Sequence, residues 1–96
     1  MNRSLALELL AGGKRHLVAR YGVTRLALFG STVRDQARDD SDVDVLVSFD
    51  GPATSERYFG VQFYLEDLLG APVDLVTDKA LRPELRAFVE GEAVHV

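Results

Sequence analysis

The chain has 96 residues, which suits one small domain over residues 1–96, and it carries a formal net charge of −4. This acidic balance argues against duplex nucleic acid as a partner, because duplex-binding proteins usually present a basic face. The absence of cysteine excludes disulfides and thiolate metal sites. No apolar run approaches the roughly 20 residues of a membrane span, and Glu8 and Gly12-Gly13 interrupt the apolar N-terminal stretch. We therefore expect a cytoplasmic protein that has no membrane partner.

The first expected element is a helix over Ser4–Tyr21, with a glycine directly after it as a stop signal. The apolar residues expected on its buried face are Leu5, Leu9, Leu10, Leu17 and Val18. A glycine in a helix interior costs about 1 kcal/mol relative to alanine. Gly12-Gly13 is therefore a point at which the segment can divide into two helices.

The rest of the chain alternates between short apolar runs typical of strands and longer amphipathic runs typical of helices. The expected strands are Arg25–Phe29, Val43–Phe49, Val73–Val76 and a short terminal one within Ala93–Val96. The expected helices are Thr32–Ala37, Thr54–Leu69 and Pro83–Glu90. This order predicts an α/β (α+β) domain in which helices pack on one small β-sheet.

Two aspartates stand at the entrance of the second strand. Because side chains alternate along a strand, Asp42 and Asp44 point to the same face. Asp74 interrupts the apolar third strand. The long helix before it allows a right-handed parallel crossover, which would place Asp74 beside Asp44. A carboxylate buried within such a strand needs a partner, because an unpaired buried charge is costly.

These three carboxylates define a candidate metal site. Like charges this close raise a pKa, and a divalent cation removes the penalty. Oxygen ligands suit Mg²⁺ or Mn²⁺, and two such ions clamp an in-line phosphoryl or nucleotidyl transfer. His16 and His95 have no ligand spacing and are assigned to solvated or core-edge positions. For an arbitrary D-x-D pair such as Asp42 and Asp44, ordinary turn chemistry is the favoured interpretation, and Asp74 shifts the balance toward a metal.

The turn at Gly30-Ser31 is a candidate phosphate site. Gly30 allows a tight exit from the first strand, and a helix that begins there offers free N–H groups to an anion. Taken alone, Ser31 is more readily interpreted as the N-cap of that helix. A cation such as Arg34 in the first helical turn has the wrong sign for the helix dipole unless a phosphate binds there. The alternative for Arg34 is a surface ion pair with Asp39 or Asp40.

One site can contain both features only if the first strand ends where the second begins. The first two strands would then be antiparallel, and the second and third parallel, so that the β-sheet is mixed. Ser31 and Arg34 would bind phosphates, and the aspartates would hold the metals that bridge them.

Three motifs carry a family resemblance: Gly30-Ser31-Thr32-Val33-Arg34, Ser41-Asp42-Val43-Asp44 and Pro72-Val73-Asp74-Leu75-Val76. They resemble the nucleotidyltransferase domain of the DNA-polymerase-β-like superfamily. From about Arg15 to Val96, the chain is most similar to the small prokaryotic branch, the minimal nucleotidyltransferases (MNT). The resemblance implies the nucleotidyltransferase fold. One departure is Asp35, because relatives often have glycine there, and its charge near the phosphate site could weaken nucleotide binding or alter substrate choice.

By this resemblance, Gly30 and Ser31 hold ATP or another nucleoside triphosphate, and Asp42, Asp44 and Asp74 bind two Mg²⁺ ions. Family members of this size often form the antitoxin half of a toxin–antitoxin pair with a helical HEPN ribonuclease. The resemblance therefore implies transfer of AMP from ATP to a tyrosine of a HEPN toxin. The alternative is a non-catalytic antitoxin that neutralises the toxin by binding. Transfer to a small molecule or RNA is disfavoured by the acidic balance and the short chain, and a homo- or hetero-oligomer is left open.

Four aromatic residues fall in the longest expected helix, at Tyr58, Phe59, Phe63 and Tyr64. Their positions suit an amphipathic helix, so we expect them in the core and not on a base-stacking platform.

Overall fold

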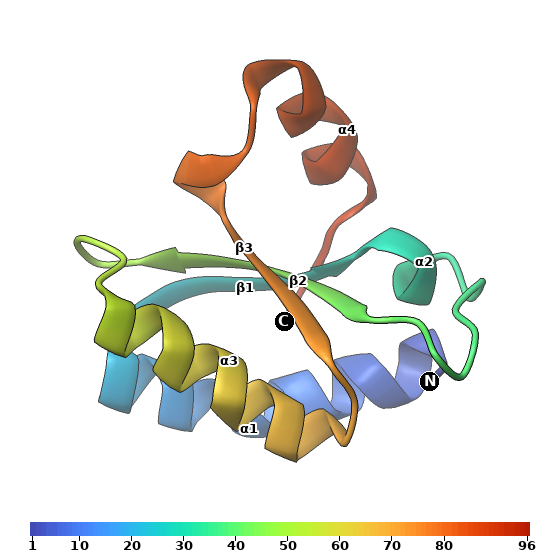
Figure 1. The fold of residues 1–96 in the computed structure, drawn as a ribbon, viewed down its shortest axis with the longest axis horizontal. Coiled ribbons are helices and arrows are strands. Elements are labelled where there is room, and N and C mark those ends of the chain that lie inside the picture. Colours follow the sequence, from blue (N-terminus) through green and yellow to red (C-terminus); the bar gives the residue numbers. More distant parts are fainter.

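A four-stranded β-sheet with helices on both faces organises the chain, and the computed structural model describes all residues from Met1 to Val96. The helices are α1 (Arg3–Tyr21), α2 (Gly30–Val33), α3 (Ser55–Leu69) and α4 (Pro83–Glu92), with a short 3-10 helix at Asp78–Ala80. The strands are β1 (Val23–Phe29), β2 (Val43–Phe49), β3 (Val73–Thr77) and β4 (Val94–His95). Helices α1 and α3 lie side by side on one face of the sheet, and α4 lies on the other (Figure 1). None of the helices combines the length and apolar character needed to span a bilayer.

The sheet is mixed, as the sequence predicts. Strand order is β3-β2-β1-β4, with β1 antiparallel to β2 and β4, and with β2 parallel to β3. The register pairs Phe29 with Asp44 and Asp44 with Asp74. The turn at Gly30 and both of these aspartates therefore lie at the same end of the sheet.

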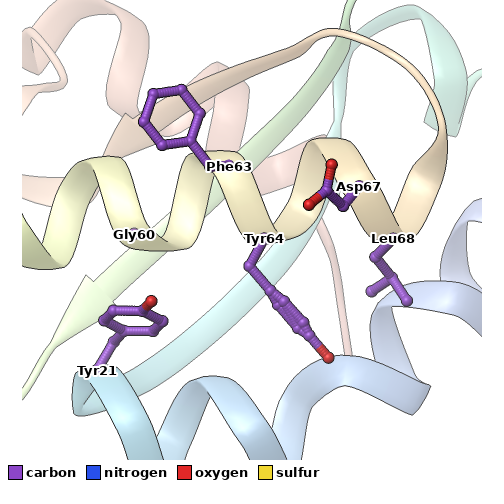
Figure 2. A pocket seen from close by; sticks show the side chains of 6 residues that line it. All are labelled: Tyr21, Gly60, Phe63, Tyr64, Asp67 and Leu68. Carbon is purple, nitrogen blue, oxygen red and sulfur yellow. The ribbon is translucent and has the colours of Figure 1, made fainter.

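Helix α1 is a single unbroken helix, so the expected division at Gly12-Gly13 is wrong. Gly13 is buried against α3, where an added Cβ would lie 2.6 Å from Leu68 Cδ2. Gly60 of α3 in turn leaves room for the ring of Tyr21 (Figure 2). These two glycines allow α1 and α3 to pack closely, and that packing offsets their cost within a helix.

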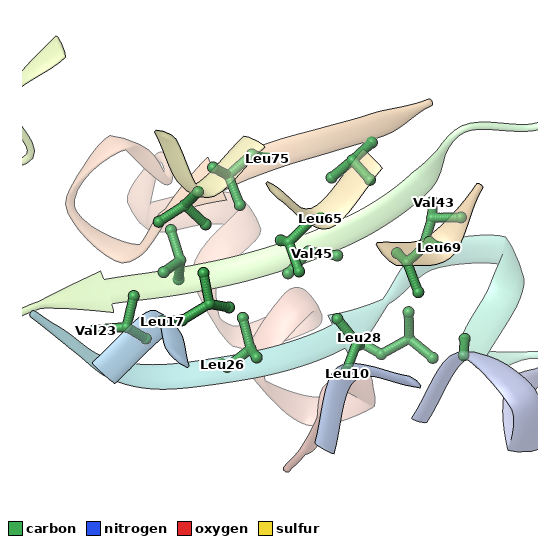
Figure 3. Packing of buried hydrophobic residues seen from close by; sticks show 14 of the residues in the cluster. Leu10, Leu17, Val23, Leu26, Leu28, Val43, Val45, Leu65, Leu69 and Leu75 are labelled. Atoms are coloured by element: carbon green, nitrogen blue, oxygen red, sulfur yellow. The ribbon is translucent and has the colours of Figure 1, made fainter. Parts of the chain in front are cut away.

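The main hydrophobic core lies between the sheet and the α1–α3 pair (Figure 3). Its fully buried members include Leu10, Leu17, Leu26, Leu28, Val45, Val47, Val61 and Leu65. The buried face of α1 is narrower than expected, because Leu5 and Val18 are 43% and 45% exposed. The core consequently uses Ala6, Leu10, Gly13 and Leu17 of this helix.

The aromatic residues of α3 divide between the core edge and the surface. Tyr58 and Tyr64 are partly buried against the core, as expected. Phe59 and Phe63 are exposed and stack on each other, so the expectation that they belong to the core is wrong. They follow the apolar period of the helix but lie on the side that faces away from the sheet.

A smaller cluster joins α4 to the opposite face of the sheet, where Ala27, Leu46 and Val89 are buried together. Side chains alternate along β2, so Asp44 shares the face of Leu46. The carboxylates therefore lie on the face that carries α4, away from the α1–α3 pair.

Side chains of α3 cover the outer edge of β3. The Tyr58 hydroxyl donates to the carbonyl of Leu75 at 2.6 Å, and Gln62 Nε2 donates to the carbonyl of Val73 at 3.3 Å. The Val73 N–H donates to Glu66 Oε2 at 3.1 Å. The three side chains are spaced four residues apart, so one face of the helix binds the backbone groups of the strand.

Candidate active site

The Gly30 turn links β1 to the site and needs glycine for two reasons. Gly30 has φ +76°, a left-handed conformation that other residues adopt at a cost. The Asp44 carboxylate also lies directly against its Cα, so that an added Cβ would collide with this carboxylate. The glycine thus brings the backbone and the carboxylate together at the end of the sheet.

Helix α2 is a single turn, much shorter than the expected helix over Thr32–Ala37. It begins at Gly30 itself, and the residue in the N-cap position, Phe29, makes no side-chain cap. The interpretation of Ser31 as an N-cap is therefore wrong. Ser31 is instead the second residue of α2. It is half-buried and lies at the same end of the sheet as the aspartates.

The loop after α2 takes its shape from Asp35, which has φ +55°. Asparagine, aspartate and glycine tolerate this left-handed conformation best, which accounts for an aspartate at a position suited to glycine. Its Oδ1 accepts a hydrogen bond of 2.8 Å from the N–H of Arg3, at the start of α1. The Asp35 charge is therefore directed to a helix N-terminus, where it is favourable, and not to the Gly30 turn.

Asp44 and Asp74 form the centre of the carboxylate group. They lie opposite each other in the parallel register of β2 and β3. Desolvation, followed by the interaction with Asp74 and the charges of Asp42 and Glu92, raises the pKa of Asp44 to about 6. Asp42, directly before β2, is exposed.

The expectation that Asp74 is the buried carboxylate is wrong. Asp74 is exposed, because β3 is an edge strand, whereas Asp44 lies in β2 between two neighbouring strands. The desolvation penalty therefore falls on Asp44 and not on Asp74.

Arg34 directly follows α2 and binds a residue that the sequence did not indicate. Its Nη1 donates to Glu92 Oε2 at 2.6 Å, and its Nε donates to Gln36 Oε1 at 3.3 Å. Arg34 therefore forms an ion pair, but its partner is Glu92 and not Asp39 or Asp40, the partners of the alternative interpretation. The other oxygen of this carboxylate, Glu92 Oε1, accepts the Gly30 N–H at 2.8 Å.

Comparison with known proteins assigns this arrangement to a family. The family model described as "Nucleotidyltransferase domain" matches residues 12–96. The chain belongs to the nucleotidyltransferase domain family. Among curated relatives, the "Protein adenylyltransferase MntA" of Thermococcus cleftensis is 40% identical over 89 residues, which cover 93% of this chain and 90% of that protein. A Methanocaldococcus jannaschii protein, also assigned as a protein adenylyltransferase, is 38% identical over 93% of this chain and 92% of its own length.

Solved structures share the fold of this nucleotidyltransferase. A structure assigned as a minimal nucleotidyltransferase superposes with a TM-score of 0.82 and is 38% identical, covering 98% of this chain and 95% of the other. A "toxin-antitoxin with AMP-PNP" crystal structure superposes with a TM-score of 0.69 at 20% identity, over 99% of this chain and 72% of that one. The first confirms the minimal nucleotidyltransferase fold, and the second adds a fold-level likeness.

Nucleotidyltransferases usually use divalent metals, and the donor atoms here fit such an ion in kind. Asp42, Asp44 and Asp74 offer only carboxylate oxygens, the ligands that Mg²⁺ and Mn²⁺ prefer. The repulsion that raises the pKa of Asp44 is the penalty that a divalent cation removes. The structure brings Asp44 and Asp74 together, but no three histidine or acidic side chains converge on one metal-binding point. Phosphate oxygens would have to complete the coordination shell.

The open groove of the nucleotidyltransferase, about 550 Å³ in volume, lies elsewhere (Figure 2). It is lined by residues of α1 and α3, on the face of the sheet that does not carry Asp44. Asp42 and Asp74 are exposed and Asp44 is half-buried, and none of the three lines the groove.

Proposed function

We propose that this nucleotidyltransferase is a Mg²⁺-dependent protein adenylyltransferase that transfers AMP from ATP to a tyrosine of a partner HEPN toxin and so acts as its antitoxin. The observation that carries the proposal is the Asp44–Asp74 pair, held in register beside the Gly30 turn. The Thermococcus relative is a protein adenylyltransferase by name, which supports a protein acceptor, and the toxin–antitoxin crystal structure with AMP-PNP supports a toxin as the partner.

In the proposed site, one group of residues binds the triphosphate and another binds the metal. The Gly30 N–H, Ser31 and Arg34 bind the triphosphate. Asp42, Asp44 and Asp74 hold one or two Mg²⁺ ions, for which Mn²⁺ can substitute. Such an ion would supply the positive charge that stabilises the negative charge developing on the phosphate groups during nucleotidyl transfer.

The exposure of the carboxylates suits an acceptor supplied by another molecule. Asp42 and Asp74 both face solvent. A tyrosine hydroxyl presented by a partner can therefore approach the α-phosphorus. Its oxygen forms a new bond to this phosphorus, the bond from the phosphorus to the oxygen that bridges the α- and β-phosphates breaks, pyrophosphate leaves, and the hydroxyl proton passes to water. Because the chain has no enclosed acceptor pocket near these residues, the partner must provide its own means of docking.

A second candidate, an antitoxin that neutralises the toxin by binding alone, is favoured by a different observation. Phe59 and Phe63 on α3 are 48% and 61% exposed, and on α4 Leu85 and Phe88 are 51% and 64% exposed. Such apolar side chains contribute strongly to protein interfaces. This function would need none of the aspartates.

The two candidates separate in one experiment. The chain is incubated with the product of its neighbouring gene, with Mg²⁺ and with ATP labelled at the α-phosphate, and ribonuclease activity is measured afterwards. For the adenylyltransferase we expect label on a toxin tyrosine, and no label with the Asp42→Asn/Asp44→Asn variant. If that variant neutralises the toxin as well as the parent chain does, binding alone is the function.

A further inference from the structure

The last residue of α4, Glu92, occupies the groups that the proposed function assigns to the triphosphate. Its Oε1 accepts the Gly30 N–H at 2.8 Å, and its Oε2 accepts Arg34 Nη1 at 2.6 Å. The Glu92 side chain is only 16% exposed, so it is largely buried against the Gly30 turn and Arg34. One carboxylate thus satisfies a backbone donor and a guanidinium, as a phosphate group would.

The local chemistry of Glu92 is unfavourable in two respects. A carboxylate at a helix C-terminus has the wrong sign for the helix dipole. Glu92 also adds negative charge near Asp44, which already faces Asp74. The contacts with Gly30 and Arg34 compensate for both costs, and a triphosphate that took over these contacts would release Glu92 to a more favourable, solvated position.

We propose that Glu92 is an internal anion that fills the triphosphate position in the free chain and is displaced by the nucleotide, so that it sets the nucleotide affinity. This inference rests on the proposed function, because it takes Gly30 and Arg34 as triphosphate-binding groups. In the free chain Glu92 keeps the turn and the arginine in place. During binding it competes with the substrate.

Displacement of Glu92 needs only a rotation of its side chain. The backbone after Glu92 is fixed, because Val94 and His95 pair with β1 and the Val96 N–H donates to the Leu26 carbonyl at 3.0 Å. Lys14 Nζ also donates to the Val96 carbonyl at 2.6 Å. We therefore expect α4 and β4 to keep their places when the nucleotide binds.

The test is Glu92→Gln, with Glu90→Gln as the matched control. Glu90 lies on the same helix and also pairs with an arginine, Arg25, at 2.6 Å, but it does not touch the Gly30 turn. Binding of Mg²⁺–ATP and of inorganic tripolyphosphate is measured by calorimetry, and thermal unfolding is recorded for each variant. We expect Glu92→Gln to bind both ligands about three- to tenfold more tightly while melting at a lower temperature. Glu90→Gln should bind them as the parent chain does.

The opposite signs of the two readouts distinguish competition from a purely structural role. A structural Glu92 would lower the melting temperature and either leave the affinity unchanged or weaken it, which would overturn the inference. Weaker Mg²⁺–ATP binding in Glu92→Gln, with unchanged binding of tripolyphosphate alone, would make Glu92 a metal ligand and also overturn the inference.

If neither the parent chain nor any variant binds a triphosphate, the proposed function fails together with the inference. If the parent chain binds one and Glu92→Gln binds no better, only the inference fails. Should Glu92→Gln fold poorly, Glu92→Ala provides the same comparison.

Discussion

Asp44 faces Asp74 across the parallel pair of β2 and β3 and presses against the Cα of Gly30 on its other side. The carboxylate is thereby held between a second carboxylate and a turn that admits no side chain. The same position that suits it for binding a cation makes it costly when no cation is present.

The first prediction concerns the pH dependence of this cost. The folded-state pKa of Asp44 is about 6, above the ordinary value of 3.8, so the folded chain retains this proton more tightly than the unfolded chain does. Asp44 therefore contributes no penalty below about pH 4, and it destabilises the metal-free fold increasingly as the pH rises toward 6. Because Asp44 is only partly buried, solvent screening reduces the full effect to about 1–2 kcal/mol.

Replacing Asp44 with asparagine isolates this contribution. Asp44→Asn should stabilise the metal-free protein at pH 7 and should have little effect near pH 4, as measured by denaturant unfolding at both pH values. Asp74→Asn is the comparison, because Asp74 is exposed and should change stability less. A stabilisation by Asp44→Asn that is equal at both pH values would contradict the raised pKa.

The second prediction concerns the metal. Asp42, Asp44 and Asp74 do not converge on a complete coordination shell by themselves. Mg²⁺ should therefore raise the melting temperature more when a nucleoside triphosphate is present than when it is absent, because phosphate oxygens supply the missing ligands. Thermal scans with each ligand alone and with both provide the measurement. Equal shifts in the presence and absence of nucleotide would argue against a shared metal–phosphate site.

The third prediction compares two glycines with similar backbones. Gly30 and Gly70 have φ values of +76° and +66°, but an added Cβ would collide with Asp44 at Gly30 and would meet no atom within 4 Å at Gly70. Gly70→Ala should cost about 1 kcal/mol, which is the price of the left-handed backbone. Gly30→Ala should cost about 1–3 kcal/mol more, because the methyl group must displace the carboxylate.

Urea unfolding of both glycine variants measures the difference. The double variant Gly30→Ala/Asp44→Ala serves as the control, since removal of the carboxylate should recover most of the excess cost of Gly30→Ala. Equal losses of stability for Gly30→Ala and Gly70→Ala would show that the close contact with Asp44 is not present in solution.

The fourth prediction uses the adjacent glycines of α1. At Gly12 an added Cβ meets nothing within 4 Å, whereas at Gly13 it meets the Leu68 side chain. Gly12→Ala should stabilise the fold by about 0.5–1 kcal/mol through the better helix propensity of alanine. Gly13→Ala should lose that gain or destabilise the fold, because α3 must shift. Thermal unfolding distinguishes them, and equal stabilisation by both changes would contradict the close packing of α1 and α3.

The alternation of apolar and polar residues in the second strand predicts both its extent and the face of its aspartates correctly. The expected strand over Val43–Phe49 is β2 to the residue, and the alternation of side chains places Asp44 beside Asp74 as anticipated. The mixed sheet followed from a single requirement, that the Gly30 turn and the aspartates meet. These features depend on local periodicity and on the handedness of one crossover.

Features that depend on distant parts of the chain could not be read in the same way. The exposure of Asp74 follows from the edge position of β3. The alternation of apolar and polar residues in β3 does not predict where this strand lies in the strand order. Glu92 reaches Gly30 and Arg34 only because α4 returns across the sheet, so no motif near residue 30 indicates it. Asp35, two residues after α2, has a left-handed backbone conformation that cannot continue a helix. The residue type at this position does not by itself predict that conformation.

The side chains that α3 places along β3 limit how other chains can join this sheet. An incoming strand at this edge would compete with Tyr58, Gln62 and Glu66 for the backbone groups of Val73 and Leu75. The exposed strand edge that often leads to sheet extension or aggregation is therefore protected here by a helix of the same chain. At the opposite edge, β4 has only two residues and pairs with Ala27 and Leu28 of β1. At the β3 edge, contact with another protein is therefore left to side-chain surfaces and not to backbone pairing.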